Sequence, residues 1–322
     1  MKRSTKILLI VASALVILGA TIFLTAMVTN NWDWSKLETM RLETNTYEIG
    51  ESFKDISIKG KASNIIILPS EDGMCKIVCE DYEKVDYSVT VVDGMLLVEM
   101  SDERKWYDRI NVISFKAPQI TLYMPSGEYG SLYAGATAAN VEIPDGFVFE
   151  AVDITLTVGN ITFGADVTEN ASLKTTHGNI HIKDLSAGKI YTSATSGNIT
   201  AEKIQCVGDV KIDITSGRIR LDSVNCKNFS SSGASGDIHL KNVIASENIA
   251  VVRETGDVNF DGSDAGNISV NTETGDVKGT LLSEKLFLVN TTTGKVDVPQ
   301  TTNGGICKII TDTGSVKIEI AN

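Results

Sequence analysis

Four acidic residues at matched spacing are the most suggestive chemical feature of the sequence. Glu254 and Asp257 recur 19 residues later as Glu273 and Asp276. If the two segments are adjacent parallel strands, the equivalent carboxylates lie side by side. That arrangement is unfavourable unless the charge is screened or a cation such as Ca²⁺ bridges the carboxylates. A polysaccharide-active enzyme on a β-helix would use such a cluster together with a basic residue that abstracts a proton.

The other interpretation of this acidic group is a solvated surface, in which Arg253 and Lys278 supply compensating positive charge. This second interpretation is the better one, because exposed carboxylates on neighbouring strands are common and need no ligand. We therefore predict no metal site and no cofactor. The four carboxylates are kept only as a weak Ca²⁺ candidate.

Histidine-based chemistry has little support. The chain has three histidines, and the repeat described below places His181 and His239 in one outward column, about 14 Å apart, too far to share a metal ion. His177 lies beside Gly178 at a predicted turn. No serine, cysteine or carboxylate is spaced to form a nucleophile and base pair with a histidine. The sequence thus predicts no catalytic residues and a protein that is not an enzyme.

A five-residue phrase recurs along the C-terminal two thirds of the chain. It reads Thr-Val-Gly-Asn-Ile at 157–161, Thr-Ser-Gly-Asn-Ile at 195–199 and Asp-Thr-Gly-Ser-Val at 312–316. Ile or Val stands two residues after every glycine, which is typical of a strand with one buried face. The glycines are 19 or 20 residues apart and are Gly159, Gly178, Gly197, Gly217, Gly236, Gly256, Gly275, Gly294 and Gly314.

This repeat predicts an all-β fold, a single-stranded β-solenoid (parallel β-helix) with one coil of 19–20 residues per repeat. Equivalent residues of successive coils should stack about 4.8 Å apart. Glycine at each corner permits a sharp turn, and the Asn or Asp that follows can bond nearby backbone. The alternation of inward and outward residues along each strand, which we call the parity, places Ile219 and Ile238 inside and Arg220 and Lys241 outside. A β-propeller needs about 40–45 residues per blade, and alternate repeats here do not differ.

Two of the five cysteines share a position in the repeat. Cys206 and Cys226 each lie nine residues after their glycine, so coil stacking brings their Cα atoms to about 4.8 Å, within the range that a disulfide allows. Side chains of parallel strands in register point the same way, which strains the bond. The sequence therefore predicts contact and leaves the disulfide open. For most of the cysteines, small buried side chains are the favoured interpretation.

An apolar run over residues 7–28 indicates a membrane anchor. As a helix it would be about 33 Å long, enough to cross a bilayer core of about 30 Å. Lys2, Arg3 and Lys6 precede it, and the positive-inside rule places that end in the cytoplasm. A cleaved signal peptide is the alternative, but its apolar region is usually about 7–15 residues long.

These signals divide the chain into five parts. Residues 1–6 form a cytoplasmic tail, 7–28 the transmembrane signal anchor, 29–50 a juxtamembrane linker, 51–128 an N-terminal β segment or cap, and 129–322 the β-solenoid. Asp93-Gly94, between two apolar runs of the cap, predicts a hairpin turn. The net charge of −12 disfavours nucleic-acid binding. The expected partners are the lipid bilayer, through residues 7–28, and an envelope polymer or membrane protein.

Three sets of motifs resemble a known family. They are Phe53-x-x-Ile-x-Ile with Asn64-Ile-Ile-Ile-Leu-Pro, Ile120-x-Leu-x-Met-Pro running into Glu128-Tyr-Gly-Ser-Leu, and the train of glycine phrases. Together they resemble the bacterial β-strand-repeat proteins of unknown function that are often labelled adhesins. The resemblance covers nearly the whole exported region. It implies the fold rather than an activity, and it brings no catalytic or binding residues.

We therefore expect a membrane-anchored extracytoplasmic β-solenoid that acts without catalysis in cell-envelope interaction or surface binding. A rigid sheet that presents side chains at fixed spacing suits contact with a polymer or a protein. One alternative is an accessory or sensor component of an envelope-stress system. A second is the polysaccharide-active enzyme considered above.

Overall fold

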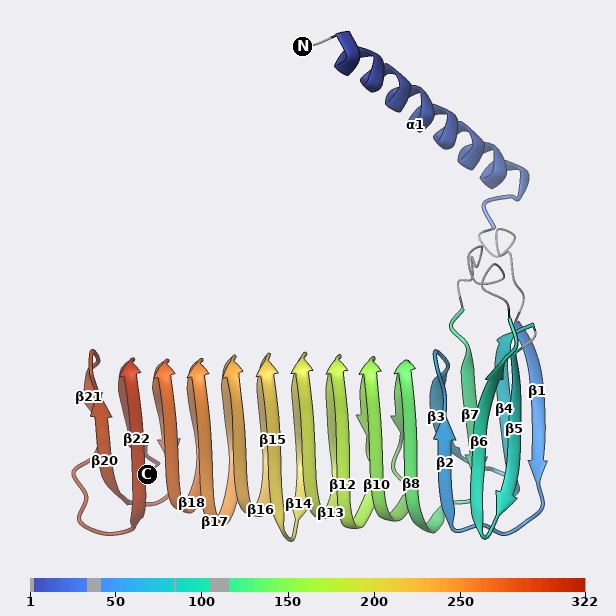
Figure 1. Ribbon diagram of the computed structural model, residues 1–322. Coiled ribbons are helices and arrows are strands. Elements are labelled where there is room, and N and C mark those ends of the chain that lie inside the picture. The colour runs from blue at the N-terminus through green and yellow to red at the C-terminus, as the bar shows by residue number, and fades with distance from the viewer. Residues whose placement is uncertain (1–2, 34–41, 84, 105–115, 322) are drawn as a thin grey trace.

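The computed structural model describes residues 3–33, 42–83, 85–104 and 116–321. One helix, α1 (Arg3–Thr29), precedes a rod of stacked strands (Figure 1). The strands of the first part are β1 (Leu42–Ile49), β2 (Asp55–Lys59), β3 (Asn64–Pro69), β4 (Cys75–Tyr82), β5 (Val85–Val92), β6 (Met95–Asp102) and β7 (Gln119–Met124).

The strands of the repeat region follow without another helix among the described residues. They are β8 (Gly127–Ala138), β9 (Val141–Ile143), β10 (Phe147–Val158), β11 (Ile161–Phe163), β12 (Asp166–His177), β13 (Ile180–Ser196), β14 (Ile199–Cys206), β15 (Asp209–Ser216), β16 (Ile219–Ser235), β17 (Ile238–Thr255), β18 (Val258–Thr274), β19 (Val277–Leu281), β20 (Lys285–Thr291), β21 (Val296–Asp297), β22 (Gly305–Thr313) and β23 (Val316–Ile320). The predicted β-solenoid is confirmed.

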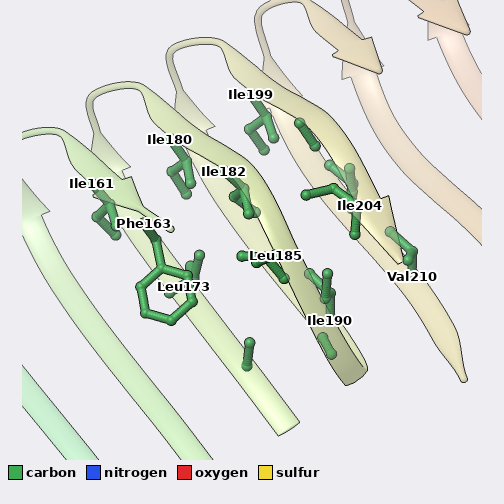
Figure 2. Close-up of a cluster of buried hydrophobic side chains, with 14 of the residues drawn as sticks. Ile161, Phe163, Leu173, Ile180, Ile182, Leu185, Ile190, Ile199, Ile204 and Val210 are labelled. Atoms are coloured by element: carbon green, nitrogen blue, oxygen red, sulfur yellow. The ribbon is translucent and has the colours of Figure 1, made fainter. Parts of the chain in front are cut away.

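Parallel pairing holds the coils in the register that the glycine spacing predicts. Ile180 pairs with Ile161 on one side and with Ile199 on the other. All three are buried and form one column of the core, which Figure 2 shows between the strand layers. Ile219 and Ile238 are fully buried and Arg220 and Lys241 are exposed, so the predicted parity is confirmed.

Corner glycines are required for two separate reasons. At Gly197 the φ angle is +148°, a region that other residues rarely adopt. A Cβ atom there would also lie 1.8 Å from the carbonyl oxygen of Gly178, the equivalent residue of the preceding coil. Gly294 and Gly314 lack the positive φ but meet the same close approach. Backbone from adjacent coils therefore meets at every corner, and no side chain fits between.

The residue after each corner glycine links one coil to the next. The backbone N–H of Asn179 donates to Oδ1 of Asn160 at 2.8 Å, and that of Asn198 donates to Oδ1 of Asn179 at 2.9 Å. Aspartates take over further along, where the N–H of Asp276 donates to Oδ1 of Asp257 at 2.9 Å. The sequence predicted that these side chains bond backbone at the turn, and the structure places that backbone in the adjacent coil.

The last two coils are exchanged in space relative to their order in the sequence. β22 pairs with β18 on one side and with β20 on the other, and β23 lies in the same way between β19 and β21. The coil of residues 305–320 is thus inserted before the coil of residues 285–297, which forms the end of the rod (Figure 1). Strictly successive stacking, expected for the whole repeat region, stops at Leu281.

A buried ion pair spans the inserted coil. Nζ of Lys285 in β20 lies 2.6 Å from Oδ1 of Asp264 in β18, and the lysine side chain is 4% exposed. Gly305, which pairs with Lys285, lies in the intervening coil and has no side chain to obstruct the contact. The ion pair therefore fastens the terminal coil to the one two positions away.

The N-terminal end shows a matching exchange. β2 pairs with β6 and β8, and β3 pairs with β7 and β9, so the first coil of the chain lies between two later ones. β4 then adds antiparallel to β7, β1 adds antiparallel to β4, and β5 adds antiparallel to β6. The hairpin turn at Asp93-Gly94 is confirmed, with positive φ at both residues. Residues 42–49 form β1, although they fall within the linker expected over 29–50.

Candidate binding surface

A column of outward side chains crosses the face formed by β8, β10, β12, β13 and β15. In order along the rod it contains Tyr133, Asp153, Ser172, Tyr191 and Lys211, each paired in register with the next. Tyr133 is 39% exposed, and three coil steps separate it from Tyr191, about 14 Å. Two aromatic rings thus bracket a short stretch of small polar side chains.

Lysines flank the second ring of the column. The ammonium groups of Lys174 and Lys211 each lie 5.5 Å from the ring centroid of Tyr191, within range of a cation–π contact. Nζ of Lys211 also lies 3.0 Å from Asp213, and this hydrogen-bonded contact raises the pKa of the lysine above its ordinary value. The ring is therefore held in place and the surface around it carries both charge signs.

A groove of about 410 Å³ runs beside Tyr133. Its polar lining beside Tyr133 consists of Ser57, Ser131, Asp153, Asn170 and Ser172. Oγ of Ser172 is buried and has no hydrogen-bond partner among the described residues. Buried hydroxyl groups are normally satisfied, so this hydroxyl lacks the partner that such a group usually has.

A larger hollow, about 750 Å³, lies at the N-terminal end of the rod between β1, β4 and β8. Its apolar surface includes Phe53 and Tyr129, whose rings stack with centroids 6.1 Å apart. Glu48, Glu51 and Asp72 are exposed at its rim. An acidic rim of this kind disfavours anionic ligands, so this hollow is less suited to charged envelope polymers than the tyrosine column.

The four carboxylates singled out from the sequence fall into two structural roles. Glu254 and Glu273 are exposed on adjacent coils, as expected. Asp257 and Asp276 each follow a corner glycine and use one oxygen to accept a backbone N–H from the adjacent coil. Within the residues described, no group of three or more His, Cys, Asp or Glu side chains is arranged to hold a metal ion. The Ca²⁺ candidate gains no support from this geometry.

Arg253 corrects the sequence interpretation. It was expected to lie on the acidic surface, yet it is 3% exposed and points into the core. The repeat explains the position, because Arg253 pairs with Gly233 and Thr272 in an inward column. A Cβ at Gly233 would lie 2.1 Å from Nη1 of Arg253, so the glycine provides the space for the guanidinium.

The histidines and cysteines lie where the repeat predicts. Through a continuous register, His181 and His239 occupy one outward column, three coils apart. Gln205 pairs with Asn225, which keeps the neighbouring Cys206 and Cys226 in register, and both are buried free thiols. Burial raises the pKa of Cys226 to about 12, so its thiolate is strongly disfavoured.

Sequence reasoning did not single out the tyrosine column. A signal was present, because Tyr191 stands six residues before Gly197 and Tyr133 stands six residues before Ala139, which takes the place of the corner glycine. Outward tyrosines six residues before the corner can therefore be read from the repeat.

Several solved structures are similar to this chain. One, from Parabacteroides distasonis and described as a "putative adhesin", has a TM-score of 0.48 and 14% identity, over 87% of this chain and 98% of that one. A protein of the same description from Parabacteroides merdae has a TM-score of 0.44 and 15% identity, over 87% and 96%. A "putative lipid binding protein" from Parabacteroides distasonis has a TM-score of 0.41 and 13% identity, over 88% and 98%.

No curated protein matches the sequence. The family described as Toastrack DUF4097 matches residues 53–229 and 207–322. These two overlapping matches cover the described strands from β2 to β23. The chain therefore belongs to the Toastrack DUF4097 family.

Proposed function

We propose that this protein is a membrane-anchored extracytoplasmic rod that binds a cell-surface polysaccharide, without catalysis, through the column from Tyr133 to Lys211. The observation that carries the proposal is the pair of outward tyrosines, in register about 14 Å apart, with Asp153 and Ser172 between them.

Sugar chemistry matches this arrangement. One face of a pyranose ring is largely C–H and packs on an aromatic ring, whereas the hydroxyl groups at its edge need polar partners. Tyr133 and Tyr191 would support two ring positions of an extended glycan. The groove beside Tyr133 offers Asp153 and Asn170 to the sugar hydroxyls.

The anchor supports an extracytoplasmic location. Thr5–Thr29 is long and apolar enough to cross a membrane, with a mean hydropathy of 2.9, and its most apolar stretch of 18 residues is exposed. Lys2 and Arg3 precede this segment, which favours a cytoplasmic N-terminus and an exported rod. Protease added to intact cells should then digest the rod, whereas protection of the repeats would refute this orientation.

Binding can be tested by co-sedimentation of the full chain, in detergent, with purified peptidoglycan that retains its attached glycopolymers. The variant Tyr133→Ala/Tyr191→Ala should lower binding at least tenfold, because stacking on both rings is lost. Tyr123→Ala is the matched control. Tyr123 also lies near a lysine, with Lys76 Nζ 5.2 Å from its ring centroid, but it is on β7, outside the column. Equal binding by the wild type and the double variant would refute the proposed site.

A further inference from the structure

The terminal coil leaves a strand edge without a partner. Among the described strands, β20 pairs only with β22, and β21 pairs only with β23. The backbone N–H and C=O groups on the outer edge of β20 therefore have no strand to bond. Such an edge is a template for another strand unless charge or a bulge protects it.

The core is also uncovered at this end. Inward-facing Phe287 and Val289 are only half-buried, whereas their partners in the next coil, Cys307 and Ile309, are 1% and 0% exposed. On the other side of the coil, Val296 is 49% exposed. These side chains lack the further coil that would complete their packing.

The outward side of β20 is apolar as well. Leu286 and Leu288 are 40% and 57% exposed, and neighbouring Ile306 of β22 is 46% exposed. Residues 286–294 contain no charged side chain, in a chain whose net charge is −12. The edge strands at the opposite end differ, since β1 carries Glu43 and Glu48 and β5 carries Asp86. Negative charge therefore disfavours strand pairing at the N-terminal end of the rod, whereas residues 286–294 at the opposite end carry none.

We propose that two copies of this chain associate through the terminal coil of residues 285–297, the tip of the rod. In this tip-to-tip arrangement, β20 of one copy pairs antiparallel to β20 of the other across a two-fold axis. Two acidic molecules repel each other over most of their surfaces, so the uncharged tip is where a second copy can approach closely. A two-fold axis makes the same strand pair with itself in antiparallel direction.

The sequence of β20 suits this pairing. With the axis at Leu288, Phe287 lies opposite Val289 and Leu286 lies opposite Asn290, so inward and outward side chains stay on their own faces. The two cores become continuous and the outward leucines meet. The loop that returns to β22 bonds the β20 strand only at its first residue, where the Thr301 hydroxyl donates to the Lys285 carbonyl.

This contact does not depend on polysaccharide binding, because the tip is far along the rod from the tyrosine column (Figure 1). Its consequence is a homotypic junction between two anchored rods. Loss of glycan binding in the tyrosine variants leaves the tip intact, so the two proposals fail separately.

The test is the mass of the full chain in detergent, measured by light scattering with the detergent subtracted. The wild type should have the mass of two chains at tens of micromolar. Leu288→Lys, which places two ammonium groups at the axis, should have the mass of one. Val252→Lys should keep the dimer, because Val252 is similarly exposed, at 51%, and lies on β17 on the same face of the rod. A monomeric wild type, or a Leu288→Lys variant that stays dimeric, would overturn the proposal.

A second measurement locates the contact. Under mild oxidation, Leu288→Cys should form a covalent dimer, because each copy presents the new thiol at the axis. Val252→Cys should not cross-link, and the native cysteines described here are free and mostly buried. Cross-linking that is equal at both positions would indicate non-specific contact and contradict the tip-to-tip arrangement.

Discussion

Replacing Arg253 with methionine should stabilise the protein. The guanidinium is buried, at 3% exposure, and its one hydrogen bond runs from Nη2 to Oγ of Ser231 at 2.8 Å. Nε and Nη1 have no partner among the described residues. Replacing a buried charged group with an apolar one of similar volume is often neutral or stabilising, by about 1–4 kcal/mol.

The size of the effect follows from the pKa. Burial lowers the pKa of Arg253 from its ordinary value to about 10, and nearby Asp213 offsets this only in part. At about 1.4 kcal/mol per tenfold change in proton affinity, the charged form is disfavoured by about 3 kcal/mol. The methionine variant loses one charge-assisted hydrogen bond, worth about 1.5–3 kcal/mol. The expected net gain is therefore between zero and about 1.5 kcal/mol.

The gain should depend on pH with a definite sign. Because the folded state holds this proton less tightly than the unfolded chain, the wild type carries the full penalty below pH 10 and loses it as the pH rises from 10 towards the ordinary pKa of arginine. The advantage of the variant should accordingly be complete at pH 8 and smaller at pH 11. Comparing the two proteins at each pH cancels the titration of groups that they share.

Chemical denaturation of the full chain, followed by circular dichroism, measures the change. Arg220→Met is the matched control, since Arg220 is exposed and its replacement should change the free energy of unfolding by less than about 0.5 kcal/mol. If Arg253→Met is less stable than the wild type by more than about 1 kcal/mol, the guanidinium has a compensating partner in the core and the reasoning fails.

The remaining predictions concern the corners, the parity and the inserted coil. Gly197→Ala should destabilise the protein by more than about 3 kcal/mol, because its Cβ has no room. Gly50→Ala, where nothing lies within 4 Å, should be nearly neutral. Equal unfolding midpoints for the two variants would contradict the close backbone approach at the corners. Ile219→Asp should unfold its coil by placing an unpaired charge in the core, measured as lost hydrogen-exchange protection. Lys285→Met should destabilise the protein by about 1–3 kcal/mol, because the Asp264 carboxylate, 17% exposed, loses its cation, and an unchanged unfolding midpoint would show that the pair is dispensable.

The periodic features of the fold could be predicted from the sequence because they arise from local geometry. A glycine every 19 or 20 residues fixed the coil length, and the alternating Ile and Val set the buried face. The exchange of the last coils was not predictable, because the phrases around Gly294 and Gly314 are equivalent. Which neighbour each coil adopts depends on long-range contacts such as Lys285 with Asp264.

The binding surface was less predictable than the fold for a different reason. Tyr133 and Tyr191 lie in one column of the repeat, but no local pattern distinguishes a ligand-binding tyrosine from an ordinary exposed one. Arg253 shows the converse difficulty. Its position in the repeat is inward, yet its charge favoured an outward assignment, and the space that Gly233 leaves for it becomes visible only when adjacent coils are in register.

The exchanged coil order limits how the rod can form during synthesis. Residues 285–297 leave the ribosome before residues 305–320, yet the later coil is the surface on which the earlier one packs. Winding can proceed from one coil to the next as far as β19 and must then pause until the final segment inserts. Shortening the chain by its last coil would therefore remove two coils of structure. New repeats can be added only to the interior of the rod, where each coil follows its neighbour.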